Sequence, residues 1–243
     1  MYMENLLNSL FDIEISQASK VKSGTLVART YASLRDNIIS GHLKPNTKLR
    51  IEGLREHYKV GAGTLREALG LLVADALVVS QGQRGFRVAP MSAENFYDIA
   101  ELRILLESKA LRSSINNGDD KWEALVISTL YTLSKAEKRL LSGAPEDGDY
   151  WLSCNKDFHE ALLSKCTSRW TLHFLHILWG QGDRYRRVSF AHYPGARDVH
   201  GEHDAIKEAA IARDCDKAIE LLVQHINAGN EIVGKALENN LLQ

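Results

Sequence analysis

The chain has 243 residues, enough for one large domain or two of ordinary size, and its hydrophobic content of 44% allows a buried core. No apolar stretch approaches the roughly 20 residues that cross a bilayer. The first residues lack the basic start and long apolar run of a secretory signal, and the three cysteines show no C-x-x-C spacing. These features exclude a membrane-spanning or disulfide-rich protein and favour a cytoplasmic one.

Charge is distributed unevenly along the chain. Residues 22–90 contain 11 Lys and Arg against 5 Asp and Glu, whereas the rest contains 19 against 26. A basic block beside an acidic block indicates two modules with different partners, although chance scatter of surface charge is the alternative. We expect an N-terminal arm over residues 1–22, a first domain over 23–90 and a second over 91–243.

The first domain shows the pattern of a winged helix-turn-helix. Apolar residues at helical spacing predict a helix that ends at Gly41, and a short second helix is expected over residues 51–59. Thr64 and Glu67 form a T-x-x-E capping box, which predicts that a third helix begins at Thr64. Two short helices joined by a glycine-containing turn are typical of a helix-turn-helix. Two β-rich runs around residues 81–85 then predict a hairpin, or wing.

Basic residues in this domain favour DNA as the partner. Arg66 is expected in the first turn of the third helix, where arginine can pair with guanine in the major groove. The wing and the turn before the second helix supply further cations for phosphates. The alternative is a winged domain for protein contacts, with Arg66 paired to an acidic neighbour. The residues expected at DNA are Thr64, Arg66, Arg84, Gly85, Arg87, Arg50 and Arg55, with Lys44 and Lys48 as further phosphate contacts.

The second domain is expected to be an all-α antiparallel bundle, so the fold class is mostly α. Helical periodicity continues to the end of the chain, and its breaks fall at polar or glycine-containing segments. The expected helices lie near residues 93–116, 119–142, 149–165, 168–189, 196–213 and 215–238.

Two histidines of this domain stand at equal distances from a turn. His203 lies eleven residues before Asp214 and His225 lies eleven after it. Eleven helical residues span about 16 Å, so folding the two helices back at Asp214 brings both imidazoles to one height. Asn155 and His159 are four apart and share a helix face. One oxygen and three imidazoles suit a divalent metal, and zinc, nickel and manganese are all admitted. Ordinary hydrogen-bonded or surface histidines are the alternative.

A pocket for a small carboxylate is expected beside this cluster. Guanidinium groups match the shape of a carboxylate, and two arginine-bearing segments, E-L-R-I-L-L-E and D-R-Y-R-R, lie in the helical domain. A surface pair between Arg103 and Glu107, four residues apart, is the alternative for the first segment. The candidate effector residues are Arg103, Arg184, Tyr185 and Arg186.

The motifs T-L-R-E-A-L and Q-R-G-F-R-V resemble the GntR family of bacterial transcription regulators, where an R-E-A-L helix precedes a glycine-containing wing. The helical remainder resembles the FCD effector domain of the family's FadR-type branch. One departure stands at Gly61-Ala62-Gly63, where the family usually has a Ser-Arg pair that contacts DNA. The resemblance implies a homodimer on a pseudo-palindromic operator, but the operator sequence does not carry over.

The resemblance also implies a ligand set. Many FCD domains bind a metal through an Asp or Asn four residues before one His, together with two later His, and Asn155, His159, His203 and His225 match this pattern. The segments G-A-G-T-L-R-E-A-L and D-R-Y-R-R are similar to the CsiR subgroup of carbon-starvation regulators. That likeness implies a dicarboxylate effector such as glutarate or 2-hydroxyglutarate.

The function expected is a ligand-responsive repressor that a small organic acid releases from its operator. A metal-dependent helical enzyme is one alternative, but the chain has no H-E-x-x-H motif and no Glu three residues before a His. We therefore expect no enzyme activity. A regulator that senses the metal itself is the other alternative, which the neutral Asn155 disfavours.

Overall fold

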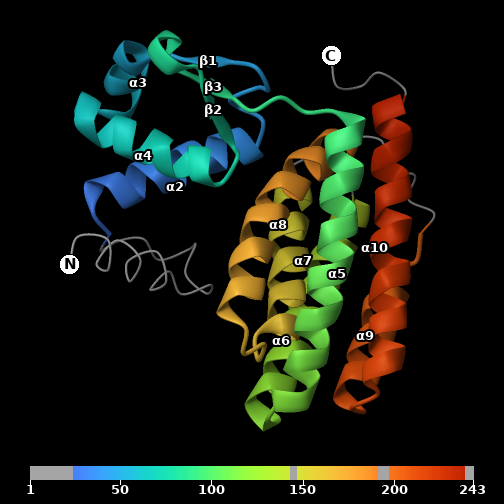
Figure 1. Ribbon diagram of the computed structural model, residues 1–243. Helices are drawn as coiled ribbons and strands as arrows, with labels where there is room; N and C mark the ends of the chain where they lie inside the picture. The colour runs from blue at the N-terminus through green and yellow to red at the C-terminus, as the bar shows by residue number, and fades with distance from the viewer. Residues whose placement is uncertain (1–23, 143–146, 191–196, 239–243) are drawn as a thin grey trace. The chain divides into compact units, whose positions relative to one another are not determined.

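The computed structural model describes residues 24–142, 147–190 and 197–238. The chain divides between Ala89 and Pro90 into two compact units. The first contains short helices and a small sheet, and the second contains long helices only (Figure 1). The arm expected over residues 1–22 lies outside the described residues. Within the described ranges, none of the helices combines the length and hydropathy that crossing a membrane requires.

The first unit is a three-helix winged fold. Its antiparallel sheet has the strand order β1-β3-β2, with Val78 opposite Val88 and Leu49 opposite Phe86. The helix-turn-helix and the hairpin are confirmed, whereas β1 has only two residues, too few to give a periodicity in the sequence. The elements are α2 (Leu26–Ile39), β1 (Lys48–Leu49), α3 (Ile51–Tyr58), α4 (Ala62–Ala74), β2 (Val78–Ser80), the 3₁₀ turn η1 (Gly82–Arg84) and β3 (Phe86–Val88).

The third helix begins two residues earlier than the capping box predicts. The α4 helix starts at Ala62 after Gly61, which caps it with extended backbone and no side-chain hydrogen bond. Lys59 ends α3 in the left-handed conformation, with φ of 53°, so the turn is completed before Thr64 is reached. Thr64 therefore lies inside the first turn, and Arg66 lies in the second. The predicted start at Thr64 is wrong, because the turn geometry at Lys59 sets the helix start.

The second unit is a six-helix bundle, as expected. Its α5 helix packs against α8 and α10, while α6 packs against α7 and α9, and α9 against α10. A continuous apolar core built around Trp122, Phe158 and Leu175 holds these helices together. Figure 1 shows them running side by side. The helices are α5 (Ala93–Asn117), α6 (Asp120–Ser142), α7 (Asp147–Leu163), α8 (Arg169–Phe190), α9 (Val199–Ile211) and α10 (Cys215–Glu238).

The turn between α9 and α10 is fixed by Arg213. Its φ of 62° makes the reversal, and its guanidinium donates to the carbonyl oxygens of Ile115 and Gly118 at 2.8 and 3.2 Å. A Cβ at Gly118 would lie 2.3 Å from the Trp122 ring, so only glycine fits there. The α9–α10 hairpin is thereby held against the turn between α5 and α6, which fixes the height of every residue along both helices.

Candidate metal and effector site

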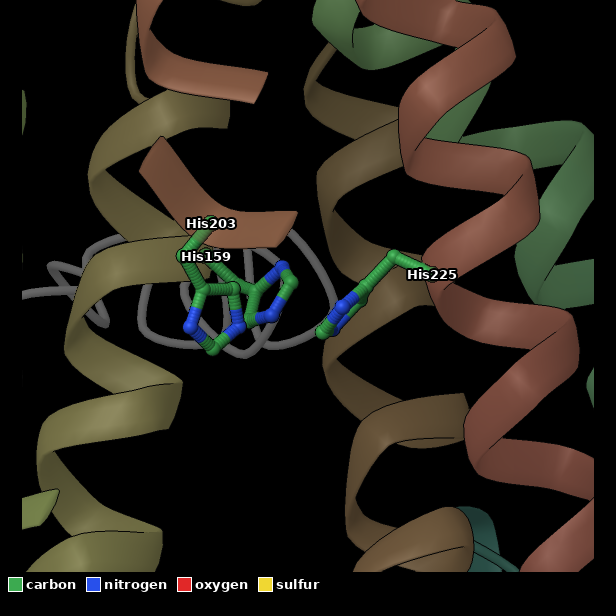
Figure 2. A group of neighbouring side chains, drawn as sticks. All are labelled: His159, His203 and His225. Atoms are coloured by element: carbon green, nitrogen blue, oxygen red, sulfur yellow. The ribbon is translucent and has the colours of Figure 1, made fainter. Parts of the chain in front are cut away.

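Three histidines from three helices converge inside the bundle. His159 on α7, His203 on α9 and His225 on α10 each offer a ring nitrogen within 4.8 Å of the others. Ring centroids are 4.6 Å apart for His203 and His225, and 5.4 and 5.2 Å from His159 to those two. Figure 2 shows the three imidazoles turned toward a common space. The equal spacing of His203 and His225 from Asp214 thus places them side by side.

The His203 ring is fully buried and has no hydrogen-bond partner on either nitrogen. Its edge faces the ring of Phe158 at 5.1 Å, and the nearest carboxylate oxygen, Oε1 of Glu137, is 3.7 Å from Nδ1. That separation exceeds hydrogen-bond distance. A buried polar atom without a partner costs roughly 1–3 kcal/mol. The protein therefore keeps two unpaired nitrogens at the centre of the cluster.

The His225 ring is held in place by a hydrogen bond to Glu202. The distance from Nδ1 of His225 to Oε2 of Glu202 is 2.7 Å, shorter than the 3.1 Å to Nη2 of Arg197, and because the nearer carboxylate only accepts, we place the proton on Nδ1. The other nitrogen, Nε2, is then the acceptor of the neutral ring. Arg197 closes this network: its Nε donates to Glu202 at 2.7 Å and its Nη2 donates to the His225 carbonyl oxygen at 2.7 Å.

Burial keeps all three imidazoles neutral. Desolvation lowers the pKa of His159 well below its ordinary value, and the neighbouring His225 and His203 lower it further. Desolvation also lowers the pKa of His203, against the opposing effect of Glu137, and lowers the pKa of His225 to about 4. Neutral imidazole is the form that binds a metal, so the cluster has the protonation state of a ligand set at neutral pH.

A cavity opens beside the cluster. His159 and His225 form part of its wall. Asn155, only 7% exposed, lines the same wall one helical turn before His159. Apolar side chains such as Phe96 and Val233 cover other parts of the lining. The structure therefore brings the four predicted ligand residues to one cavity and one neighbouring cluster.

Two of the four predicted effector residues line this cavity. Arg103 is buried and its Nε donates to Glu107 at 2.9 Å, so the pairing of these two residues occurs inside the bundle. A Cβ at Gly182 would lie 3.3 Å from Nη1 of Arg103, and the glycine therefore leaves room for the guanidinium. Arg186 reaches the cavity from α8 and pairs with Asp183 at 2.5 Å. Burial lowers the pKa of Arg186 from its ordinary value.

Arg184 and Tyr185 lie outside the cavity lining. Arg184 is buried, and its Nη1 donates to Gln181 at 3.0 Å. The hydroxyl of Tyr185 accepts hydrogen bonds from the backbone N–H of Ser92 at 3.1 Å and from Nδ2 of Asn95 at 3.0 Å. Since Ser92 caps α5, Tyr185 fastens the start of that helix to α8.

Arg197 is a cavity residue that the sequence analysis missed. Its Nη1 would lie 3.5 Å from a Cβ at Gly229, which also lines the cavity, and its other nitrogens hold Glu202 and His225. Hydrogen bonds from His225 and Arg197 lower the pKa of Glu202 to about 2, against desolvation, which raises it. No periodicity marks Arg197, because it precedes α9 and reaches the cavity through tertiary contacts.

Family comparisons match both units. Residues 26–88 match the bacterial regulatory proteins of the gntR family, and residues 98–228 match the FCD domain. The chain belongs to the GntR family and carries an FCD domain. It is therefore a DNA-binding transcription regulator and not an enzyme.

Relatives of this GntR regulator are similar over most of their length. It is 46% identical over 209 residues to the "Uncharacterized HTH-type transcriptional regulator BphR" of Paraburkholderia xenovorans, covering 86% of this chain and 85% of that protein. It is 34% identical to the "HTH-type transcriptional repressor GlaR" of Escherichia coli, covering 86% and 96%. The fold is also that of E. coli McbR/YncC, with a TM-score of 0.74 at 19% identity, covering 87% of this chain and 98% of that one. None of these likenesses tests the CsiR subgroup, which stays a prediction.

In the DNA-binding unit of this GntR regulator, two residues of α4, Arg66 and Thr64, are predicted to contact bases. Arg66 is exposed, and Thr64 is half-buried one half-turn earlier. Arg50 and Arg55 are exposed at the N-cap and in the last turn of α3. Lys44 and Lys48 are exposed before α3. Their contact with DNA stays a prediction.

The wing carries the remaining predicted DNA residues. Arg84 is exposed in η1, and Gly85 has φ of 88°, a conformation that side chains rarely adopt. Arg87 on β3 is half-buried, and its Nη1 donates to the carbonyl oxygen of Asn46. Arg84 is thus the wing cation that points away from the fold, while Arg87 ties the wing to the segment before β1.

Proposed function

We propose that this regulator is a homodimeric repressor of transcription that binds a pseudo-palindromic operator and leaves it when a small organic acid binds beside a divalent metal ion in the FCD domain. The single observation that carries the proposal is a cluster of three imidazoles, two of them in the wall of a cavity that three arginines also line. The effector class proposed is a dicarboxylate such as glutarate or 2-hydroxyglutarate.

Repression is supported by GlaR, which is named a transcriptional repressor and matches 86% of this chain. A dimer is supported by the geometry of helix-turn-helix proteins, which bind two half-sites about one helical turn of DNA apart. Two copies related by a twofold axis would present two α4 helices to such a site. On α4, Arg66 supplies the exposed donor for base edges, and on the wing Arg84 supplies a cation for phosphate.

The residues of the cluster fit a divalent metal. Nitrogen atoms within 4.8 Å of one another can meet one ion at the usual zinc–nitrogen distance of about 2.0–2.1 Å after small side-chain rotations. One unpaired nitrogen of His203 and Nε2 of His225 would each find a partner in such a cation. Asn155 offers a neutral oxygen from one turn before His159. We propose zinc as the ion, with nickel or manganese as the other ions that such donors accept.

The cavity walls favour an anion. Arg103, Arg186 and Arg197 line the cavity, and the lining contains no carboxylate among the described residues. The acidic partners of these arginines, Glu107, Asp183 and Glu202, hold the guanidinium groups in place without themselves lining the cavity. A bound metal would supply a Lewis acid for one carboxylate oxygen. The arginines would bind the second carboxylate through charge-assisted hydrogen bonds.

Operator release would follow from a difference in affinity between two arrangements of the protein. An acid that binds more tightly to the arrangement with misplaced DNA-binding units shifts the population away from the operator. The experiment is fluorescence anisotropy of a labelled fragment of the protein's own promoter, with zinc-loaded protein and increasing glutarate or 2-hydroxyglutarate. We expect the affinity for the fragment to fall at least tenfold, and to fall with rising salt in the absence of acid.

Two other outcomes would contradict this proposal. Affinity that responds to zinc alone, with no effect of any dicarboxylate, would show a metal sensor. Affinity that tightens when the acid is added would show that the acid acts as a co-repressor rather than an inducer. Control titrations with a monocarboxylate of the same length would show whether the second carboxylate is recognised.

A further inference from the structure

Glu137 reaches the histidine cluster from α6, a helix that supplies none of the three imidazoles. Its side chain is 14% exposed. Its Oε2 is 3.0 Å from Nδ1 of His200, on the surface side of α9. Its Oε1 is buried without a hydrogen-bond partner, 3.7 Å from Nδ1 of His203. One oxygen of this carboxylate is therefore satisfied, and the other points at a ring that is also unsatisfied.

Three polar atoms in this part of the described bundle lack a partner at the same place: Oε1 of Glu137 and both nitrogens of His203. Each such atom costs roughly 1–3 kcal/mol of stability. Three of them at one point therefore indicate a hydrogen bond or a bound ion that supplies the missing partners. A hydrogen bond from Nδ1 to Oε1 would satisfy two of the three atoms. It would leave Nε2 of His203 as the only atom that still needs a partner.

We propose that Glu137 is an outer-shell positioning residue, which fixes the orientation and tautomer of His203 so that Nε2 binds the metal. The proposal rests on the metal site proposed above. In proteins, a histidine that binds a metal nearly always donates its second N–H to a carboxylate, carbonyl or water. The short approach needed to close 3.7 Å is available to a glutamate side chain with several rotatable bonds.

The neighbouring histidine shows the same arrangement already formed. Nδ1 of His225 donates to Glu202 at 2.7 Å, which makes Nε2 the acceptor nitrogen of the ring. Glu202 and Glu137 would thus act alike on two adjacent ligands, from α9 and from α6. The difference is that Glu202 is anchored by Arg197, whereas Glu137 is anchored by His200.

The test is the zinc affinity of the full-length protein, measured by competition with a chromophoric chelator. We expect Glu137→Gln to bind zinc about 10-fold more weakly and Glu137→Ala about 100-fold more weakly, the range that loss of an outer-shell partner produces. Asp120→Asn is the matched control, because Asp120 is exposed in the first turn of the same helix, far along α6 from Glu137. Its zinc affinity should equal that of the wild type.

Cobalt absorption spectra separate a positioning role from a ligand role. At saturating cobalt, Glu137→Gln should keep the wild-type visible bands because the three imidazoles still bind, whereas His203→Ala should change them. Changed bands in Glu137→Gln would make Glu137 a ligand and overturn the inference. Unchanged zinc affinity in both Glu137 variants would also overturn it, while leaving the metal site intact. A wild-type protein that binds no zinc would instead refute the metal site itself.

Discussion

Replacing His203 with leucine should stabilise the metal-free protein while it abolishes the response to metal. The wild-type ring has no exposed surface and leaves one donor and one acceptor unpaired, each at a cost of roughly 1–3 kcal/mol. Leucine removes both atoms at a similar volume, and imperfect packing against Phe158 costs less than about 1.5 kcal/mol. The free energy of unfolding of metal-free His203→Leu should therefore exceed that of the wild type by at least about 0.5 kcal/mol.

The assay is urea unfolding followed by circular dichroism, with a chelator present and then with zinc. Zinc at 100 times its Kd should stabilise the wild type by about 2.7 kcal/mol and leave His203→Leu unchanged. Glu208→Leu is the control, because Glu208 is exposed on the same helix and its replacement should shift stability by less than about 0.5 kcal/mol. Metal-free His203→Leu that is less stable than the wild type would refute the reasoning, since the imidazole nitrogens would then be satisfied without metal.

Three further changes test other parts of the structure. Arg66→Ala should weaken operator binding by about 1–3 kcal/mol in anisotropy titrations and reduce discrimination between base sequences. The control Arg112→Ala, at an exposed residue of the helical unit, should have little effect. Equal losses of affinity for operator and for random DNA would contradict base contact by Arg66. Tyr185→Phe removes the hydroxyl that accepts hydrogen bonds at the start of α5, so amide hydrogen exchange in the first turn of α5 should become faster. The free energy of unfolding should fall by about 1 kcal/mol, while zinc affinity stays unchanged. Unaltered exchange in that turn would rule out a role of Tyr185 in holding the start of α5. Because the pKa of His225 is lowered to about 4 in the folded protein, the unfolded chain takes up the proton more readily. As pH falls from about 6.5 to 4, His225 should therefore contribute a loss of up to about 3 kcal/mol to the metal-free protein, beside the losses from His159 and His203. If metal-free His225→Leu lost as much stability as the wild type, the effect would belong to other groups.

The fold could be predicted from the sequence because local signals agree with tertiary packing. Apolar spacing marks the helices of both units, and the breaks between them coincide with turns. The symmetry of His203 and His225 about Asp214 predicts their meeting, because rise per residue is constant along two antiparallel helices. Asn155 and His159 follow from the spacing of one helical turn.

The rest of the site depends on contacts that no local pattern encodes. Glu137 and Arg197 reach the cluster from α6 and from the segment before α9, and their roles follow only from how the helices pack. Tyr185 lies between two arginines in sequence, yet its ring packs against Phe96, and Tyr185 does not itself line the cavity. The start of α4 was predicted two residues late because the left-handed backbone at Lys59, a residue with no strong turn preference, decides it.

The most direct test of the proposed sensing site is anomalous X-ray scattering from crystals of zinc-loaded protein, collected on both sides of the zinc absorption edge. We predict one peak per chain, about 2.0–2.1 Å from a ring nitrogen of each of His159, His203 and His225. A zinc peak elsewhere on the chain, or none at all after loading, would contradict the account.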